Sequence, residues 1–216
     1  MATATNSLPA LWTAADLWRQ LGEIPLERIR LVPAPGTATE DDLLKAEGNS
    51  DRICELVDGV LVEKTMGYLE SIIAVEIAYL LRAHLEKHPD GVVLGADGAL
   101  KILPHQVRVP DVCFISWDRF PDRKLPAESI PSLAPDLAVE VLSKGNTEQE
   151  MQRKLRDYFM AGVRLVWYID PQTRSARAYR DENTVVDLAE HESLDGGDVL
   201  PGFQLPLRRL FEKLDQ

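Results

Sequence analysis

The sequence predicts an α/β protein, because apolar runs typical of strands alternate with segments that have the period of a helix. Between Val107 and Asp170 the strand-like runs are VRVPDVCFIS, APDLAVEVLS and RLVWYID, and EQEMQRKLRDYFMAGV, before the last of them, is helical in period. A strand, a helix and a parallel strand form a right-handed unit that returns the helix over the sheet. We therefore expect a sheet with a helix packed across it.

The bulk properties are those of a soluble globular protein with one domain and an N-terminal arm. At 216 residues the chain can bury a generous core, and its 45% apolar and 27% charged residues are ordinary values. No apolar run has the length of a membrane span and no signal peptide precedes the domain, so we expect a cytoplasmic protein. Cys54 and Cys113 lie in apolar runs and are expected to be buried, reduced thiols.

The net charge of −11 argues against a nucleic-acid role, because surfaces that bind DNA are usually basic. Part of this negative charge can belong to a metal site, and lysines and arginines can still gather locally. The charge therefore counts against such a role without excluding it.

Residues 1–50 are expected to form an arm packed on the core, and residues 51–216 the main domain. A short helix is predicted from Ala14 to Leu21, with Thr13 as its N-cap. A second short helix is expected to open at Thr39, where acidic residues fall in the first turn.

A β-hairpin is predicted from Ile53 to Glu63, with Asp58-Gly59 as the turn between two short apolar runs. Its two other acidic residues, Glu55 and Glu63, are expected to face solvent or the polar side of the sheet.

The longest helix is predicted from Met66 to His88, and its apolar positions are too numerous for a single stripe. We therefore expect it to be covered on much of its circumference. Glu70 lies near its start, where a carboxylate either complements the helix dipole or belongs to a site, and the sequence favours neither.

The rest of the chain is predicted to contain four further features. They are two strands around Asp97-Gly98 between Gly91 and Leu103, a proline-rich loop over 121–135, a terminal hairpin over 177–188 and a short helix over 207–214.

Two carboxylates stand inside consecutive strand-like runs, Asp111 in the first and Glu140 in the second. A buried carboxylate costs several kcal/mol unless it is neutralised, paired or bound to a metal. One interpretation is that both end their strands and form ion pairs with Arg108 and Lys144. Two such carboxylates on neighbouring strands instead favour a site for a divalent cation.

Four segments resemble the Uma2 family of predicted endonucleases, which is placed in the PD-(D/E)XK nuclease superfamily. They are ELVDGVLVEKTMGYLES, RVPDVCFIS, PDLAVEVLSKGNT and EMQRKLRDYFMAGVRLVWYIDP. The resemblance extends from about Pro25 to Phe211, and the motifs are specific in combination.

The resemblance implies a restriction-endonuclease-like core, with a mixed β-sheet flanked by helices. By similarity Asp111 matches the first motif acid and Glu140 the second, and the backbone carbonyl of Val141 is the implied third ligand of Mg²⁺ or Mn²⁺. Glu70 would lie on the first core helix, where it binds a second ion or orients water.

The chain departs from the superfamily pattern at Leu142, which stands where the motif has a lysine. We expect Lys154, on the helix after the strand, to take that role. Lys144 has the same strand parity as Glu140, but the turn signal Gly145-Asn146 places it beyond the strand end, where a lysine is usually solvated.

The leading hypothesis is a Mg²⁺-dependent DNA endonuclease, with a homodimer as a possible working form. The alternative is a non-catalytic module that kept the fold and binds nucleic acid or protein. If DNA is the substrate, basic residues should gather around the mouth of the acidic pair. The local candidates are Arg108, Lys144, Arg153 and Lys154.

Overall fold

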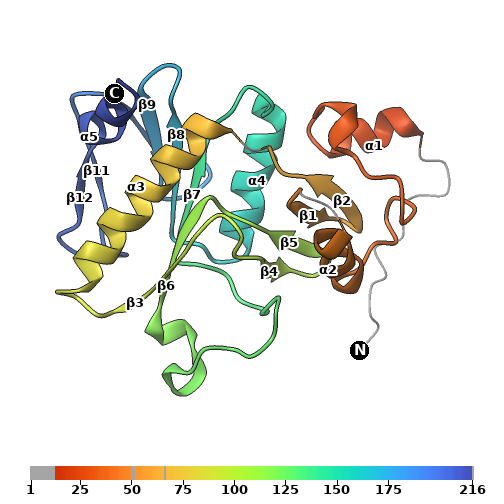
Figure 1. The fold of residues 1–216 in the computed structure, drawn as a ribbon, viewed down its shortest axis with the longest axis horizontal. Helices are drawn as coiled ribbons and strands as arrows, with labels where there is room; N and C mark the ends of the chain where they lie inside the picture. Colours follow the sequence, from red (N-terminus) through yellow and green to blue (C-terminus); the bar gives the residue numbers. More distant parts are fainter. Residues whose placement is uncertain (1–12, 50–51, 66, 216) are drawn as a thin grey trace.

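The computed structural model describes residues 13–49, 52–65 and 67–215 (Figure 1). Within these residues the main sheet has six strands in the order β10-β9-β8-β7-β6-β3. Helix α3 (Tyr68–Leu85) packs on one face of this sheet, and α4 (Glu148–Met160) packs on the other. The predicted α/β class, a sheet flanked by helices, is confirmed.

The centre of the main sheet carries the predicted crossover. β7 (Leu137–Val141) and β8 (Leu165–Asp170) are parallel, and α4 connects them. β6 (Val112–Ser116) lies antiparallel on the other side of β7, so the sheet is mixed as expected. A turn follows β7, and Thr147 then caps α4 by accepting a hydrogen bond from the Glu150 amide at 3.1 Å.

Side chains alternate along β7 between two separate cores. Val139 and Val141 join the core under α3, whereas Ala138 joins the core under α4. Glu140 has the parity of Ala138 and therefore points toward α4. Each fully buried aliphatic side chain of such a core contributes about 1.5–3 kcal/mol, so the two helices are firmly held on the sheet.

A second sheet, with four strands in the described residues, lies beside the first in the order β2-β1-β5-β4. Asp58 and Gly59 join its first two strands with φ angles of 49° and 72°, the left-handed conformation that a tight hairpin requires. The predicted hairpin is confirmed. The strands are β1 (Cys54–Val57), β2 (Val60–Glu63), β4 (Leu100–Leu103) and β5 (Gln106–Arg108).

The N-terminal segment packs on this second sheet. Thr13 and Asp16 form a reciprocal capping box at the first predicted helix, and Leu17 of that helix packs with Val57. On the other face, Leu43 of the second predicted helix packs with β1. The elements are α1 (Ala14–Gln20), η1 (Leu26–Arg28) and α2 (Glu40–Asn49).

Two direct connections between strands cross from one sheet to the other, one from β3 (Gly91–Leu94) to β4 and one from β5 to β6. Pro110 separates β5 from β6, and the two strands belong to different sheets. The two strands predicted around Asp97-Gly98 both exist, but β3 pairs with β6 and β4 pairs with β5. The two crossings place the start of β6 at the junction of the sheets.

Helix α3 is partly covered by its neighbours. It begins at Tyr68, and Met66 lies outside the described residues. Ile73 and Ile77 are fully buried on the sheet, whereas Val75 is 67% and Tyr79 58% exposed. The sheet and the C-terminal helix α5 (Leu207–Phe211) therefore cover much of its circumference, as expected, and leave a side with Val75 and Tyr79 exposed.

The C-terminal part forms the predicted hairpin and short helix. The hairpin adds two strands to the main sheet, and the last helix packs with α3. The remaining elements are η2 (Trp117–Arg119), η3 (Pro121–Arg123), β9 (Ser175–Tyr179), β10 (Val185–Ala189), β11 (Ser193–Asp195), β12 (Gln204–Pro206), α5 (Leu207–Phe211) and η4 (Glu212–Leu214).

Cys54 and Cys113 are buried and belong to no disulfide among the described residues, and burial raises the pKa of Cys113 to about 12. In the part of the chain that the structure describes, no helix is long and apolar enough to cross a membrane.

Candidate active site

Asp111 lies at the junction of the two sheets, between Pro110 and the first residue of β6. Its Oδ2 accepts a hydrogen bond from the Val141 amide at 2.7 Å, and its Oδ1 lies 2.8 Å from the Lys64 ammonium. The carboxylate is thus fixed against the end of β7 and remains 15% exposed. The predicted alternative, an ion pair with Arg108, is not formed.

Glu140, one residue before Val141, points to the opposite helix. Its Oε1 lies 3.0 Å from the Lys154 ammonium and accepts a hydrogen bond from the Tyr158 hydroxyl at 2.5 Å. Lys154 and Tyr158 lie one turn apart on α4, so both reach the same carboxylate. The crossover therefore places Lys154 over Glu140, as expected, and the sequence alternative of a pair with Lys144 is not formed.

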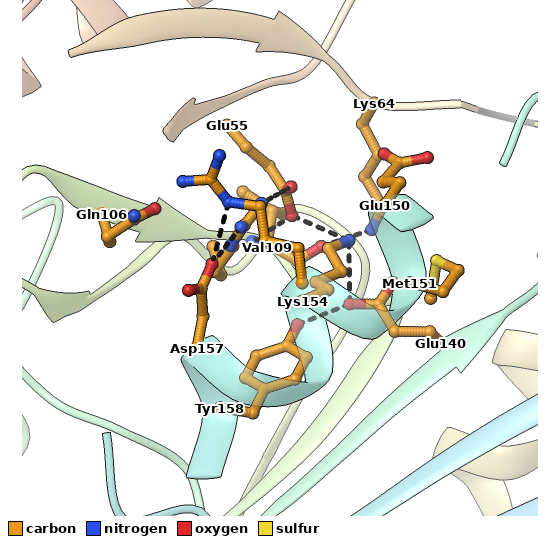
Figure 2. A network of polar contacts seen from close by, with 12 residues as sticks. Glu55, Lys64, Gln106, Val109, Glu140, Glu150, Met151, Lys154, Asp157 and Tyr158 are labelled. Carbon is orange, nitrogen blue, oxygen red and sulfur yellow. Dashed lines mark hydrogen bonds and ion pairs between the residues drawn. The ribbon is translucent and has the colours of Figure 1, made fainter. Parts of the chain in front are cut away.

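Glu55 is the residue that sequence reasoning placed wrongly. It was expected to face solvent or the polar side of the sheet, but it is buried, and its carboxylate contacts Lys154 at 3.1 Å and Arg108 at 2.8 Å. It also accepts a hydrogen bond from the Val109 amide at 3.0 Å. Figure 2 shows Lys154 between Glu55 and Glu140. β1 is covered on both faces, which a two-residue alternation cannot reveal.

Glu63 was also expected to face solvent or the polar side of the sheet, and it is also buried. Its carboxylate forms ion pairs with Arg30 at 2.5 Å and with Arg52 at 2.6 Å. Both cations are partly exposed, so Glu63 anchors basic side chains at the edge of the second sheet.

Ion pairs and the backbone of Val109 connect these groups into one network. Arg108 links Glu55 to Asp157 on α4, and Lys64 links Asp111 to the carbonyl of Val109 at 2.5 Å. The network contains four carboxylates and three cations, which leaves one net negative charge. Its members are Glu55, Lys64, Arg108, Asp111, Glu140, Lys154 and Asp157.

The two glutamates that share Lys154 have opposite pKa shifts. Burial raises the pKa of Glu55, but the charges of Lys154, Arg108 and Lys64 outweigh it and lower the pKa to about 2. For Glu140, burial prevails over Lys154, and the nearby negative charges add to it, so the pKa is raised. Burial disfavours the charge of Lys154, but its two carboxylates raise the pKa overall.

The network opens to the surface on the side of Asp111. A pocket of about 150 Å³ is lined by Asp111, Val141, Lys64 and Glu70, among others. Glu70 lies in the first turn of α3, and among the described residues its carboxylate has no hydrogen-bond or ion-pair partner. A wider groove of about 740 Å³ shares Lys64 and Glu70 with the pocket. The structure thus brings Glu70, Asp111 and Val141 to one cleft, with Glu140 and Lys154 enclosed behind it.

Residues 40–208 match the model of Uma2, a family described as "Putative restriction endonuclease". The chain belongs to the Uma2 family. A comparison with curated proteins found no match. The fold of this Uma2 protein is similar to that of a crystal structure described as "a putative nuclease belonging to DUF820" from Anabaena variabilis. That likeness has a TM-score of 0.68 at 18% identity and covers 76% of this chain and 93% of the other, which shows the nuclease-like fold.

The donor set of this Uma2 protein suits a hard divalent cation. No three His, Cys, Asp or Glu side chains of the described residues gather closely enough to hold a metal by themselves. Asp111 and Glu140 nevertheless flank Val141, whose carbonyl points to the same edge of β7 as its amide. Carboxylate and carbonyl oxygens, completed by water, are the ligands that Mg²⁺ prefers, and the network has an excess negative charge.

The basic rim of the site differs from the predicted one. Arg108 and Lys154 are buried in the network, and Arg153 pairs with Asp58 at 2.7 Å and lies 3.9 Å from Asp157 of the network. Of the four predicted residues, Lys144 alone is exposed, and it lines the groove. The other three candidates neutralise carboxylates inside the protein. Basic side chains do gather at the groove, but apart from Lys144 they are other residues, Arg28, Arg52 and Lys64.

Proposed function

We propose that this Uma2 protein is a divalent-metal-dependent endonuclease that hydrolyses phosphodiester bonds of DNA. The observation that supports it best is that Asp111 and Val141 line one open cleft, while Glu140 directly precedes Val141 on β7 and lies enclosed behind it. The family and the nuclease-like fold agree with this reaction class.

Asp111, Glu140 and the carbonyl of Val141 would hold the cation. A bound Mg²⁺ or Mn²⁺ would supply an activated water and stabilise the charge that grows at the phosphorus. Asp111 is already oriented by the Val141 amide at 2.7 Å, so little entropy is lost when it acts as a ligand. Glu70, at the mouth of the cleft, is placed to orient a water or to bind a second ion.

Lys154 would replace the lysine that the motif has at the position of Leu142. Because it comes from α4 and not from the strand, its ammonium approaches Glu140 from above the sheet, at 3.0 Å. In that position the ammonium orients the carboxylate of Glu140 and favours its ionised form, whereas burial favours the neutral form. The same charge adds to the positive potential that a phosphodiester meets at the site.

The test is binding of Mn²⁺, measured by calorimetry, together with cleavage of plasmid DNA. We expect weak binding by the wild type, and loss of both binding and cleavage in Asp111→Asn and in Glu140→Gln, because each change removes a negative ligand and keeps the shape. Asp170→Asn is the matched control, since Asp170 ends the neighbouring strand but lines a different hollow. Mn²⁺ binding of wild-type strength in both site variants would refute the assignment.

A non-catalytic module is the second candidate, and one observation favours it. Asp111 and Glu140 each already contact a lysine, so the pair is neutralised without a metal. If the wild type binds DNA fragments but neither Mn²⁺ nor Mg²⁺, this candidate replaces the nuclease.

A further inference from the structure

We infer that Lys64 shares Asp111 with the divalent cation and becomes the residue that contacts the substrate phosphate once the cation occupies Asp111. This inference rests on the proposed function and assigns a second, substrate-facing lysine to the site. Lys64 directly follows β2, outside the two strands and the helix that carry the nuclease motifs.

The contacts of Lys64 place its ammonium against Asp111, where the proposed divalent cation would bind. It lies 2.8 Å from Oδ1 of Asp111 and donates to the Val109 carbonyl at 2.5 Å. The other oxygen of Asp111 accepts the Val141 amide, so both carboxylate oxygens are engaged. A divalent ion at Oδ1 would compete with the ammonium for that oxygen, and repulsion between the two positive charges would favour displacement of the ammonium.

Lys64, in contrast to Lys154, faces the cleft. It lines both the pocket and the groove, whereas Lys154 and Glu140 line neither of these two hollows. Lys154 has carboxylates at 3.0 and 3.1 Å, which hold its ammonium on two sides. Lys64 has one carboxylate partner, and its flexible stem can carry the ammonium into the cleft when that partner binds the cation.

A phosphodiester in the cleft would meet this displaced ammonium beside Asp111. Apart from Lys64, the ionisable residues that line the pocket are two carboxylates, Glu70 and Asp111, which repel a phosphate. A positive side chain at the same place offsets that repulsion and stabilises the extra negative charge of the transition state. Lys64 thus explains how an acidic cleft can accept an anionic substrate.

The inference predicts effects of opposite sign on two measurements. Removing the charge of Lys64 removes the competitor for Asp111, so Mn²⁺ should bind about tenfold more tightly to Lys64→Met and to Lys64→Gln. Cleavage at saturating Mn²⁺ should fall by about tenfold or more in both variants, because the phosphate loses its contact. Lys64→Arg should recover part of the cleavage.

The experiment is Mn²⁺ titration by calorimetry, followed by plasmid cleavage, with circular dichroism as the check on folding. Lys64→Gln is included because its amide can still donate to the Val109 carbonyl if the methionine variant is unstable. Lys144→Met is the matched control, an exposed lysine of the same groove without a carboxylate contact, and should leave Mn²⁺ affinity unchanged.

The outcomes separate the two proposals. If Asp111→Asn abolishes Mn²⁺ binding but neither Lys64→Met nor Lys64→Gln tightens it, the role of Lys64 is wrong and the proposed function stands. If Asp111→Asn binds Mn²⁺ like the wild type, Asp111 is no ligand, and both proposals are overturned.

Discussion

Replacing Lys154 by methionine removes the one cation that Glu55 and Glu140 share. The ammonium lies 3.1 Å from the first carboxylate and 3.0 Å from the second, and all three side chains are buried. Glu55 keeps Arg108 after the substitution, at 2.8 Å. Glu140 keeps only the hydroxyl of Tyr158 among these contacts, so the cost falls mainly on Glu140.

Leaving one partner of a buried ion pair uncompensated costs about 3–5 kcal/mol. The pKa of Glu140 is already raised by burial, and loss of Lys154 raises it further, so the carboxyl can take up a proton and limit the loss. We therefore expect Lys154→Met to lower the free energy of unfolding by about 3 kcal/mol near pH 7. The double variant Lys154→Met/Glu140→Gln should recover about 2 kcal/mol of it, since the introduced amide is uncharged and its oxygen can still accept from Tyr158.

The measurement is urea unfolding followed by tryptophan fluorescence, because Trp167 is fully buried in the main core. Lys144→Met is the control and should change stability by less than about 0.5 kcal/mol, as expected of an exposed residue. On cleavage, Lys154→Met should cost roughly a hundredfold or more, and Lys144→Met much less. Mn²⁺ binding should be unchanged in Lys144→Met and weakened but retained in Lys154→Met, where a proton on Glu140 competes with the ion. A loss below about 1 kcal/mol, no recovery in the double variant, or equal cleavage losses would refute the reasoning.

Two further predictions concern stability. The pKa of Glu55 is lowered from 4.5 to about 2, so its contribution is fully present above pH 4.5 and is lost as the pH falls toward 2, by up to about 3 kcal/mol. Glu55→Gln should flatten this acid branch in urea unfolding between pH 2 and 6, and an unchanged slope would contradict the assignment. Gly59 has a φ of 72°, and an added Cβ would lie 2.6 Å from the backbone of Gly36. Gly59→Ala should therefore cost more than about 1 kcal/mol in the same assay, whereas Gly48→Ala, with open space around it, should not.

The sequence alone was sufficient for features that depend on near neighbours. The hairpin turn at Asp58-Gly59 and the cap at Thr13 were predicted correctly, because turn and capping chemistry act over two to four residues. The crossover over β7, α4 and β8 was also predicted, because its handedness follows from strand twist. The crossover rule alone predicted that Lys154, on α4, lies near Glu140, on β7.

Features that depend on how the two sheets meet came only from the tertiary structure. Glu55 and Glu63 are the two carboxylates of otherwise apolar strands, and a carboxylate there is expected to face solvent or the polar side of the sheet, yet both faces of β1 and β2 are covered. Lys64 carried no signal, because its partner Asp111 is brought to it only when Pro110 ends β5 and the chain crosses to the main sheet. Periodicity reports which side of an element is apolar. Which carboxylate meets which ammonium is decided by packing between elements distant in sequence, because a buried charge must find its partner wherever the fold supplies one.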